Sequence, residues 1–204
     1  MKAIILAGQS GHKSQVLDEA TLRAINNVAI LNEIVILTDN TNIEMQLESS
    51  IRLVTVPAST CGALATLGFA LAEIPDGTPF LVLPSNAFIP STHLTLFSES
   101  MLSAQAIVGA VVFEGNDPVY SYARLDAEGE IMEIVEKLVL GSCALAGIFF
   151  FSSKKHLSSC IKWALVNNAR NEGKFFVAPA LNFFIAHSMK INLYRISSED
   201  YVRH

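Results

Sequence analysis

A glycine-spaced turn follows the first apolar run of the chain. The run is Lys2–Ala7, and Gly8 and Gly11 come after it. A buried strand that ends in glycines can bring bare backbone N–H groups up to a nucleotide, because no side chain blocks the approach. Lys13 is the only cation close to this turn, so little positive charge is available for phosphate chemistry. A tight turn between strand and helix that binds nothing is the alternative.

The cysteines and histidines are not spaced as metal ligands. Cys61, Cys143 and Cys160 are odd in number and form no CxxC motif. The five histidines are scattered along the chain, and none has a partner at metal-ligand spacing. The sequence therefore predicts neither a disulfide framework nor a zinc site. We expect all three cysteines to be buried, reduced thiols.

Composition favours one large domain over residues 1–204. Hydrophobic residues make up 51% of the chain and charged residues 16%, which is enough apolar material for a substantial core. The net charge of −5 argues against general nucleic-acid binding, since only Lys154 and Lys155 are adjacent cations. No apolar segment approaches the roughly 20 residues needed to cross a bilayer. We therefore expect a cytoplasmic protein with neither a nucleic-acid nor a membrane partner.

Strand-like apolar runs alternate with helical patterns through residues 1–104, which is typical of βαβ units and a mostly parallel sheet. In residues 105–204, strand runs separated by turn signals predict antiparallel additions. Together these patterns predict an α/β, Rossmann-like fold with helices on both faces of a mixed, mostly parallel sheet. The predicted strands are Lys2–Ala7, Glu33–Leu37, Arg52–Val56, Phe80–Leu83, Ala106–Phe113, Ser121–Leu125, Ile131–Val135, Ala144–Phe151 and Ile191–Ile196. The predicted helices lie at about 18–28, 41–49, 61–73, 91–104, 153–167 and 177–187, and Ser91-Thr92-His93 is expected to cap the fourth.

Several segments occur in the order found in one protein family. They are residues 2–8 with Gly11, and then 60–66, 80–88, 120–126, 133–137, 144–151 and 172–179. In this order they resemble the bacterial sugar-phosphate nucleotidyltransferases, also called nucleoside-diphosphate-sugar pyrophosphorylases. The resemblance implies a nucleotide-diphospho-sugar transferase fold, with a nucleotide-binding half at 1–104 and a sugar-binding half at 105–204. The chain resembles a shortened and catalytically degenerate member.

The resemblance also implies site residues. It gives nucleotide binding to Leu6, Ala7, Gly8, Gly11 and Gly62, and sugar binding to Glu136, Lys137 and Gly147. In the family's Glu-Lys element the carboxylate accepts hydrogen bonds from sugar hydroxyls, and the ammonium neutralises the sugar phosphate. The alternatives are a solvated strand end for the Glu-Lys pair and an ordinary strand glycine for Gly147.

Departures from the family pattern fall on the catalytic residues. The basic loop after the first glycines is shortened, which leaves Lys13 as its cation, and Asn86 stands where the family has an aspartate that binds Mg²⁺. Lys13 and Asn86 are thus the catalytic candidates. Asn86 and Asp200 would form only a weak metal site, because an amide oxygen brings no negative charge to a strongly hydrated cation. An active enzyme would need Mg²⁺, whereas a binding protein would need no cofactor.

Two aromatic runs allow more than one interpretation. Phe175 and Phe176 can be core residues or a platform on which a sugar stacks. The run Phe149–Phe151 alternates faces within a strand, so it can belong to the core or to the surface of a homodimer.

Three functions are compatible with these residues. The first is transfer of a nucleotidyl group from a nucleoside triphosphate to a sugar 1-phosphate. The alternative is a non-catalytic module that binds a nucleotide or nucleotide sugar and regulates surface-polysaccharide synthesis. A structural or assembly protein with an empty pocket is the third.

Overall fold

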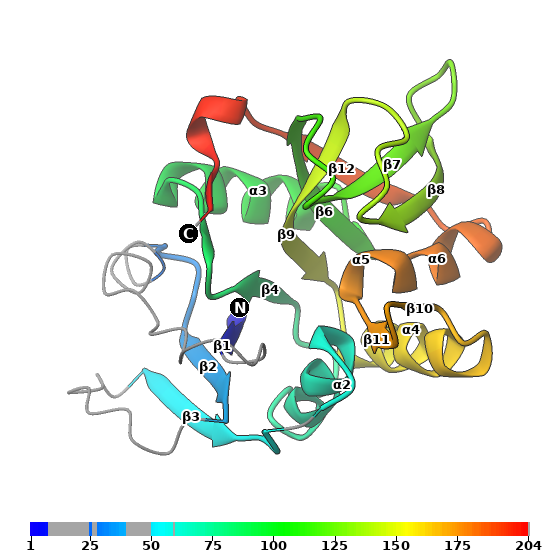
Figure 1. Ribbon diagram of the computed structural model, residues 1–204. Helices are drawn as coiled ribbons and strands as arrows, with labels where there is room; N and C mark the ends of the chain where they lie inside the picture. Colours follow the sequence, from blue (N-terminus) through cyan, green and yellow to red (C-terminus); the bar gives the residue numbers. More distant parts are fainter. Residues whose placement is uncertain (8–24, 26–27, 40–49, 59, 204) are drawn as a thin grey trace.

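The structure is a computed structural model that describes residues 1–7, 25, 28–39, 50–58 and 60–203 (Figure 1). The helices predicted at 18–28 and 41–49 lie wholly or almost wholly outside these residues. The predicted site residues Gly8, Gly11 and Lys13 also lie outside them.

A mixed sheet forms the centre of the molecule (Figure 1). Its main path runs in the order β12-β6-β9-β4-β1-β2-β3. β1 pairs in parallel with β2 and β4, β2 pairs in parallel with β3, and β12 pairs in parallel with β6. β9 runs antiparallel to β4 and β6, which confirms the predicted antiparallel addition. The strand bounds are Lys2–Ala7 (β1), Glu33–Thr38 (β2), Ile51–Thr55 (β3), Phe80–Pro84 (β4), Val108–Glu114 (β6), Cys143–Phe151 (β9) and Ile191–Arg195 (β12).

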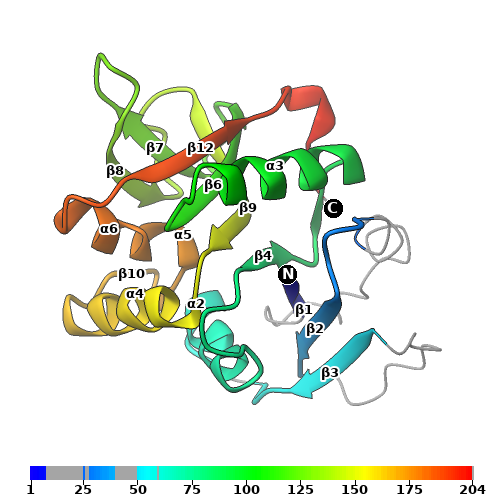
Figure 2. The same ribbon diagram turned by 180° about the vertical axis from the view of Figure 1, so that it is seen from behind.

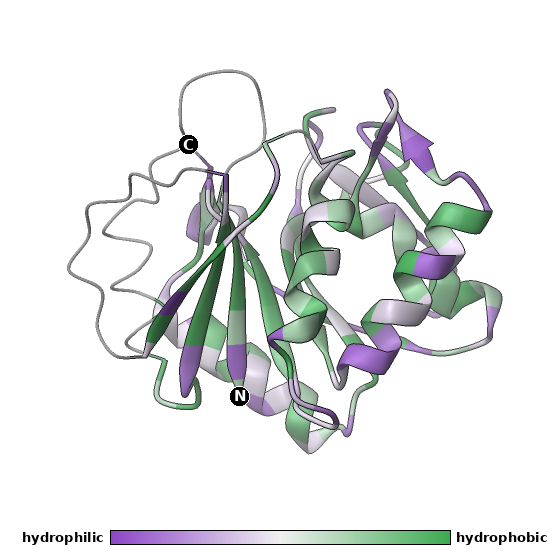
Figure 3. Ribbon diagram, turned by 90° about the horizontal axis from the view of Figure 1, so that it is seen from below, coloured by the Kyte–Doolittle hydropathy of each residue, from purple (hydrophilic) through white to green (hydrophobic). Residues whose placement is uncertain are grey.

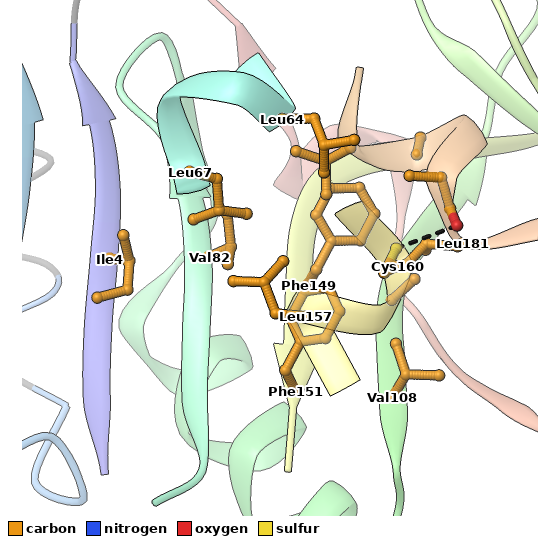
Figure 4. Close-up of a cluster of buried hydrophobic side chains, with 14 of the residues drawn as sticks. Ile4, Leu64, Leu67, Val82, Val108, Phe149, Phe151, Leu157, Cys160 and Leu181 are labelled. Atoms are coloured by element: carbon orange, nitrogen blue, oxygen red, sulfur yellow. Dashed lines mark hydrogen bonds between the residues drawn. The ribbon is translucent and has the colours of Figure 1, made fainter. Parts of the chain in front are cut away.

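Helices cover both faces of the sheet, as predicted. One face packs against α2 (Ala63–Leu67), the 3-10 helix η1 (Gly68–Ala72), α4 (Lys154–Val166), α5 (Val177–Ala180) and α6 (Asn182–Ala186). The other face packs against α3 (Ser91–Ser103), which lies in front of the sheet in Figure 2. Alternation along the strands divides the core between these two faces. Ile4 and Val82 belong to the first face (Figure 4), and Ile5 and Leu83 belong to the second.

Hydrophobic residues follow the strands through the centre of the molecule, and hydrophilic residues gather at the strand ends (Figure 3). Within β9, Phe149 and Phe151 belong to one core cluster and Phe150 belongs to the other. All three rings are therefore core, and this run gives no support to a homodimer surface.

Three predicted helix features differ from the structure. The helix expected at 61–73 is a short α2 followed by a 3-10 turn, and the helix expected at 177–187 is divided at Leu181. The Leu181 N–H bonds to the Ala178 carbonyl, three residues back, so the four-residue hydrogen-bond pattern is interrupted there. The expected cap on α3 is wrong, because Pro90 is its N-cap residue and no side chain caps it.

Short strands complete the fold around the site. β7 (Ser121–Leu125) and β8 (Ile131–Glu136) form a hairpin joined to β9 through β7, and β10 (Arg170–Asn171) pairs with β11 (Lys174–Phe175). β13 (Val202–Arg203) pairs antiparallel with β5 (Ala87–Phe88). The segment after β12 therefore returns to the end of β4 (Figure 1).

Cysteine exposure differs from the prediction at one position. Cys143 and Cys160 are buried, but Cys61 is exposed. Burial raises the pKa of both buried thiols, and the Cys160 thiol donates to the Ala180 carbonyl at 3.0 Å (Figure 4).

A thiol reagent such as DTNB should therefore modify one thiol rapidly in the folded protein and three after unfolding, with Cys61→Ser removing the rapid phase. Rapid modification of a second thiol would contradict this assignment.

Candidate functional site

A pocket of about 190 Å³ lies where β9 changes partners. Phe149 of β9 pairs with Val82 of β4, whereas Leu145 pairs with Ser121 of β7. Between Leu145 and Phe149, β9 changes its neighbour from β7 to β4. The pocket lies between β4 and β7 at this point. Its walls include Leu6, Asn86, Glu136, Gly147, Phe176, Tyr201 and Arg203. The structure thus brings one predicted nucleotide residue, the predicted catalytic Asn86 and two predicted sugar residues to a single pocket.

Gly147 lies at the point where β9 changes partners and has a φ of +77°, which L side chains rarely adopt. A Cβ at this position would lie 3.4 Å from the Pro84 Cγ, which is close to ordinary van der Waals contact. Backbone conformation therefore explains this glycine better than the need for space, although Gly147 does line the pocket as the resemblance implies.

Glu136 places a half-buried carboxylate at the pocket. The Ser121 hydroxyl donates to Glu136 Oε2, and the side-chain amide of Asn171 donates to the Glu136 carbonyl at 3.0 Å. Burial raises the pKa of the carboxyl group, and the Ser121 hydrogen bond and the charges of Lys137 and Arg203 oppose that rise. Glu136 is thus a positioned acceptor, held by the β7–β8 hairpin and by β10.

Lys137 does not line this pocket. Its Nζ bonds to Glu172 Oε2 at 2.8 Å and lies 5.7 Å from the centre of the Phe176 ring. The residue also adopts a φ of +55°, and its side chain lines a neighbouring hollow with Asn171 and Asn182. The cation expected beside Glu136 is therefore paired with another carboxylate.

Asn86 lies in the turn between β4 and β5 and lines the pocket. The preceding Ser85 N–H donates to the Leu6 carbonyl at 3.1 Å, so this turn is tied to the end of β1. Asp200 does not line the pocket, and its Oδ2 lies 3.3 Å from His93 Nε2.

Among the residues that the structure describes, the side chains predicted to bind Mg²⁺ do not form a site that fits it. Among the described residues, no group of three or more His, Cys, Asp or Glu side chains could hold a metal ion. Asn86 is neutral, and Asp200 contacts His93 instead of lining the pocket. Mg²⁺ in proteins is held mainly by carboxylate oxygens, and Glu136 is the one acidic side chain among the described residues that line the pocket.

The nucleotide side of the predicted site is described only in part. Leu6 lines the pocket, whereas Ala7 is buried in the core. Gly62 has a φ of +106°, and a Cβ there would lie 2.5 Å from the Phe175 carbonyl oxygen and 2.8 Å from its nitrogen. The close approach that requires glycine at this position is thus to β11 of the chain itself.

The sequence did not predict the aromatic residue and the cation that the C-terminal segment brings to the pocket, Tyr201 and Arg203. Tyr201 stacks on Phe113 with 4.4 Å between ring centres, and burial raises its pKa to about 12. The Arg203 guanidinium donates to the Val119 carbonyl at 3.1 Å and lies 5.5 Å from the Tyr120 ring centre. Phe175 is buried and Phe176 lines the pocket, so the two rings divide between core and site.

The architecture defines a class: the fold is the Rossmann-like α/β fold of nucleotidyltransferases, with a mostly parallel central sheet. The sequence matches no protein-family model and no curated protein. None of the described helices is both long enough and apolar enough to span a bilayer.

Solved structures show the same fold at low sequence identity. The nucleoside-diphosphate-sugar pyrophosphorylase from Vibrio cholerae RC9 is 15% identical, with 100% of this chain and 95% of that chain covered and a TM-score of 0.81. A Bacillus anthracis protein described as a candidate glucose-1-phosphate thymidylyltransferase, solved with sucrose, is 15% identical (96% and 87% covered, TM-score 0.75). A CMP:2-keto-3-deoxy-manno-octonic acid synthetase solved with CTP is 10% identical (96% and 89% covered, TM-score 0.70).

Proposed function

We propose that this protein binds a nucleotide sugar and places the sugar in the pocket between β4 and β7. The observation that supports this most directly is the positioned carboxylate of Glu136, which lines the pocket together with the Asn86 amide. An ionised acceptor and a neutral amide suit a ligand rich in hydroxyl groups. The Phe176 ring adds an apolar surface to the same pocket.

The size of the pocket favours a sugar over a complete nucleotide sugar. Sites for drug-sized ligands measure roughly 300–1,000 Å³, whereas this one measures about 190 Å³. The proposal therefore assigns the pocket to the sugar alone. Nucleotide binding at Leu6, Gly8, Gly11 and Lys13 is a further part of the proposal, supported by the glycine spacing after β1 and by the shared fold.

The proposal is for binding without Mg²⁺-dependent turnover. Nucleotidyl transfer brings two phosphate-bearing substrates together, and their negative charge must be neutralised. The described residues supply no acidic cluster that could hold a metal ion for this purpose. The role that fits is a nucleotide-sugar binding or regulatory module in polysaccharide synthesis.

The test is a thermal-shift and calorimetry panel on the full chain. It contains UDP-, dTDP- and CMP-sugars, their nucleotides and the matching sugar phosphates, each with EDTA and with Mg²⁺. We expect at least one nucleotide sugar, at about 100 times its Kd, to stabilise the protein by about 2.7 kcal/mol in EDTA, which raises Tm by about 5–10 °C. Absence of binding across the panel would refute the proposal, and Mg²⁺-dependent pyrophosphate release would refute its non-catalytic part.

A further inference from the structure

The C-terminal segment Ser197–Arg203 forms one wall of the pocket. It is held at three points along its length. Asp200 contacts His93 of α3 at 3.3 Å, the Tyr201 ring stacks on Phe113, and β13 pairs with β5 so that Arg203 lies opposite Ala87. These contacts fix the backbone that carries Arg203 to the pocket.

Arg203 brings a positive charge to the pocket. Its guanidinium makes one hydrogen bond, to the Val119 carbonyl, and lies over the Tyr120 ring. Within the part of the chain that the structure describes, it forms no salt bridge. A guanidinium has five N–H donors in a planar fork that matches carboxylate or phosphate oxygens. Donors therefore remain for a ligand, and the exposed side of the residue allows one to enter.

Opposite charges line the pocket without pairing with each other. Glu136 and Arg203 are both wall residues, and their side chains form no salt bridge. Lys137, by contrast, is paired with Glu172 outside the pocket. A ligand that fits this arrangement carries hydroxyl groups for the carboxylate and an oxyanion for the guanidinium.

We infer that Arg203 binds an oxyanion, a phosphate or a carboxylate, carried by the sugar whose hydroxyl groups bind Glu136. The inference rests on the proposed function and adds the chemical class of the sugar. Arg203 thereby takes the anion-binding role that the sequence resemblance gives to Lys137. The Tyr120 ring and the Val119 carbonyl hold the guanidinium in place before the ligand arrives, which lowers the entropic cost of binding.

Calorimetry with matched sugars tests this inference. The probes are glucose, glucose 1-phosphate and glucuronate, with the galacto and manno series run in parallel. The variants are Arg203→Gln, Arg203→Lys and Lys137→Met, and the control is Arg124→Gln, an exposed arginine paired with Glu133 outside the pocket. Urea unfolding of each variant establishes that it is folded.

The wild-type protein should prefer an anionic sugar to the neutral sugar of the same series. Arg203→Gln should weaken binding of that anionic sugar by about 10- to 100-fold and leave the neutral sugar unchanged, with Arg203→Lys intermediate. Lys137→Met and Arg124→Gln should bind as the wild type does. A preference for the 1-phosphate identifies phosphate as the oxyanion, and a preference for the uronate identifies carboxylate.

Three results would overturn the inference and leave the proposed function intact. The first is an Arg203→Gln variant that binds anionic sugars as tightly as the wild type. The second is a loss of affinity for anionic sugars in the Lys137→Met variant. The third is a wild-type protein that binds nucleotide sugars but binds the anionic and the neutral sugar of each series equally well. If the wild type binds neither these sugars nor any nucleotide sugar, the proposed function itself fails.

Discussion

Gly62→Ala is expected to lower the free energy of unfolding by about 3–5 kcal/mol. Two costs combine at this position. The φ of +106° is unfavourable for a residue with a Cβ, and that Cβ would lie 2.5 Å from the carbonyl oxygen of Phe175. The contact is with backbone, so no rotamer change relieves it. The Phe175 N–H also bonds to the Cys61 carbonyl at 2.7 Å, which holds the two segments together. Urea unfolding with linear extrapolation measures the change.

Gly77→Ala is the matched control. Gly77 has a φ of +69°, and a Cβ there would meet no heavy atom within 4 Å. Its substitution carries only the conformational cost, about 1–2 kcal/mol. If Gly62→Ala is no more destabilising than Gly77→Ala, the contact between Gly62 and β11 is not what requires a glycine.

Glu136→Gln should weaken binding of the nucleotide sugar by about 10- to 100-fold, because charge-assisted hydrogen bonds are stronger than neutral ones. Binding to the wild type should also fall as the pH is lowered through the raised pKa of Glu136, since the protonated carboxyl loses its charge. In the Gln variant this pH dependence should disappear. Calorimetry between pH 4 and 8 measures both effects.

The free energy of unfolding of Glu136→Gln shows whether its loss of binding is caused by misfolding. Because burial raises the pKa of Glu136 in the folded protein, the stability gained from its protonated form is present at low pH and is lost as the pH rises through that raised pKa. The neutral Gln variant should thus be at least as stable as the wild type at pH 7. Glu133→Gln, on the exposed part of β8 and paired with Arg124, is the control and should bind normally. Normal binding by Glu136→Gln would contradict the proposal that the Glu136 carboxylate binds the ligand.

The sheet could be predicted from sequence because its signal is local. The predicted bounds of β1 and β7 are those of the structure, and the bounds of the other main strands differ by one or two residues at one or both ends. Apolar runs bounded by turn residues are typical of strands buried on both faces. The pairing of β9 with both β4 and β6 could be expected only as antiparallel additions, because register depends on contacts between distant segments.

Sequence predicts a site residue when its role follows from the type of its side chain. It does not predict where a side chain points when distant segments decide the direction. Glu136 lines the pocket as expected, but the direction of Lys137 is decided by Glu172, which lies 35 residues away in the sequence. The close approach at Gly62 involves Phe175, and the pocket contacts of Tyr201 and Arg203 depend on the pairing of β13 with β5. A two-residue strand has no periodicity from which it could be predicted.

The order of strands in the sheet means that residues 1–104 and 105–204 are not separable folding units. β9, from residues 105–204, pairs with β4, from residues 1–104, and β6 pairs with the other side of β9 in the same hydrogen-bonded sheet. A fragment ending near residue 104 would leave β4 with an unpaired apolar edge, and such edges favour aggregation. Each half of the chain therefore depends on the other to fold, and the proposed binding is best tested on the full chain.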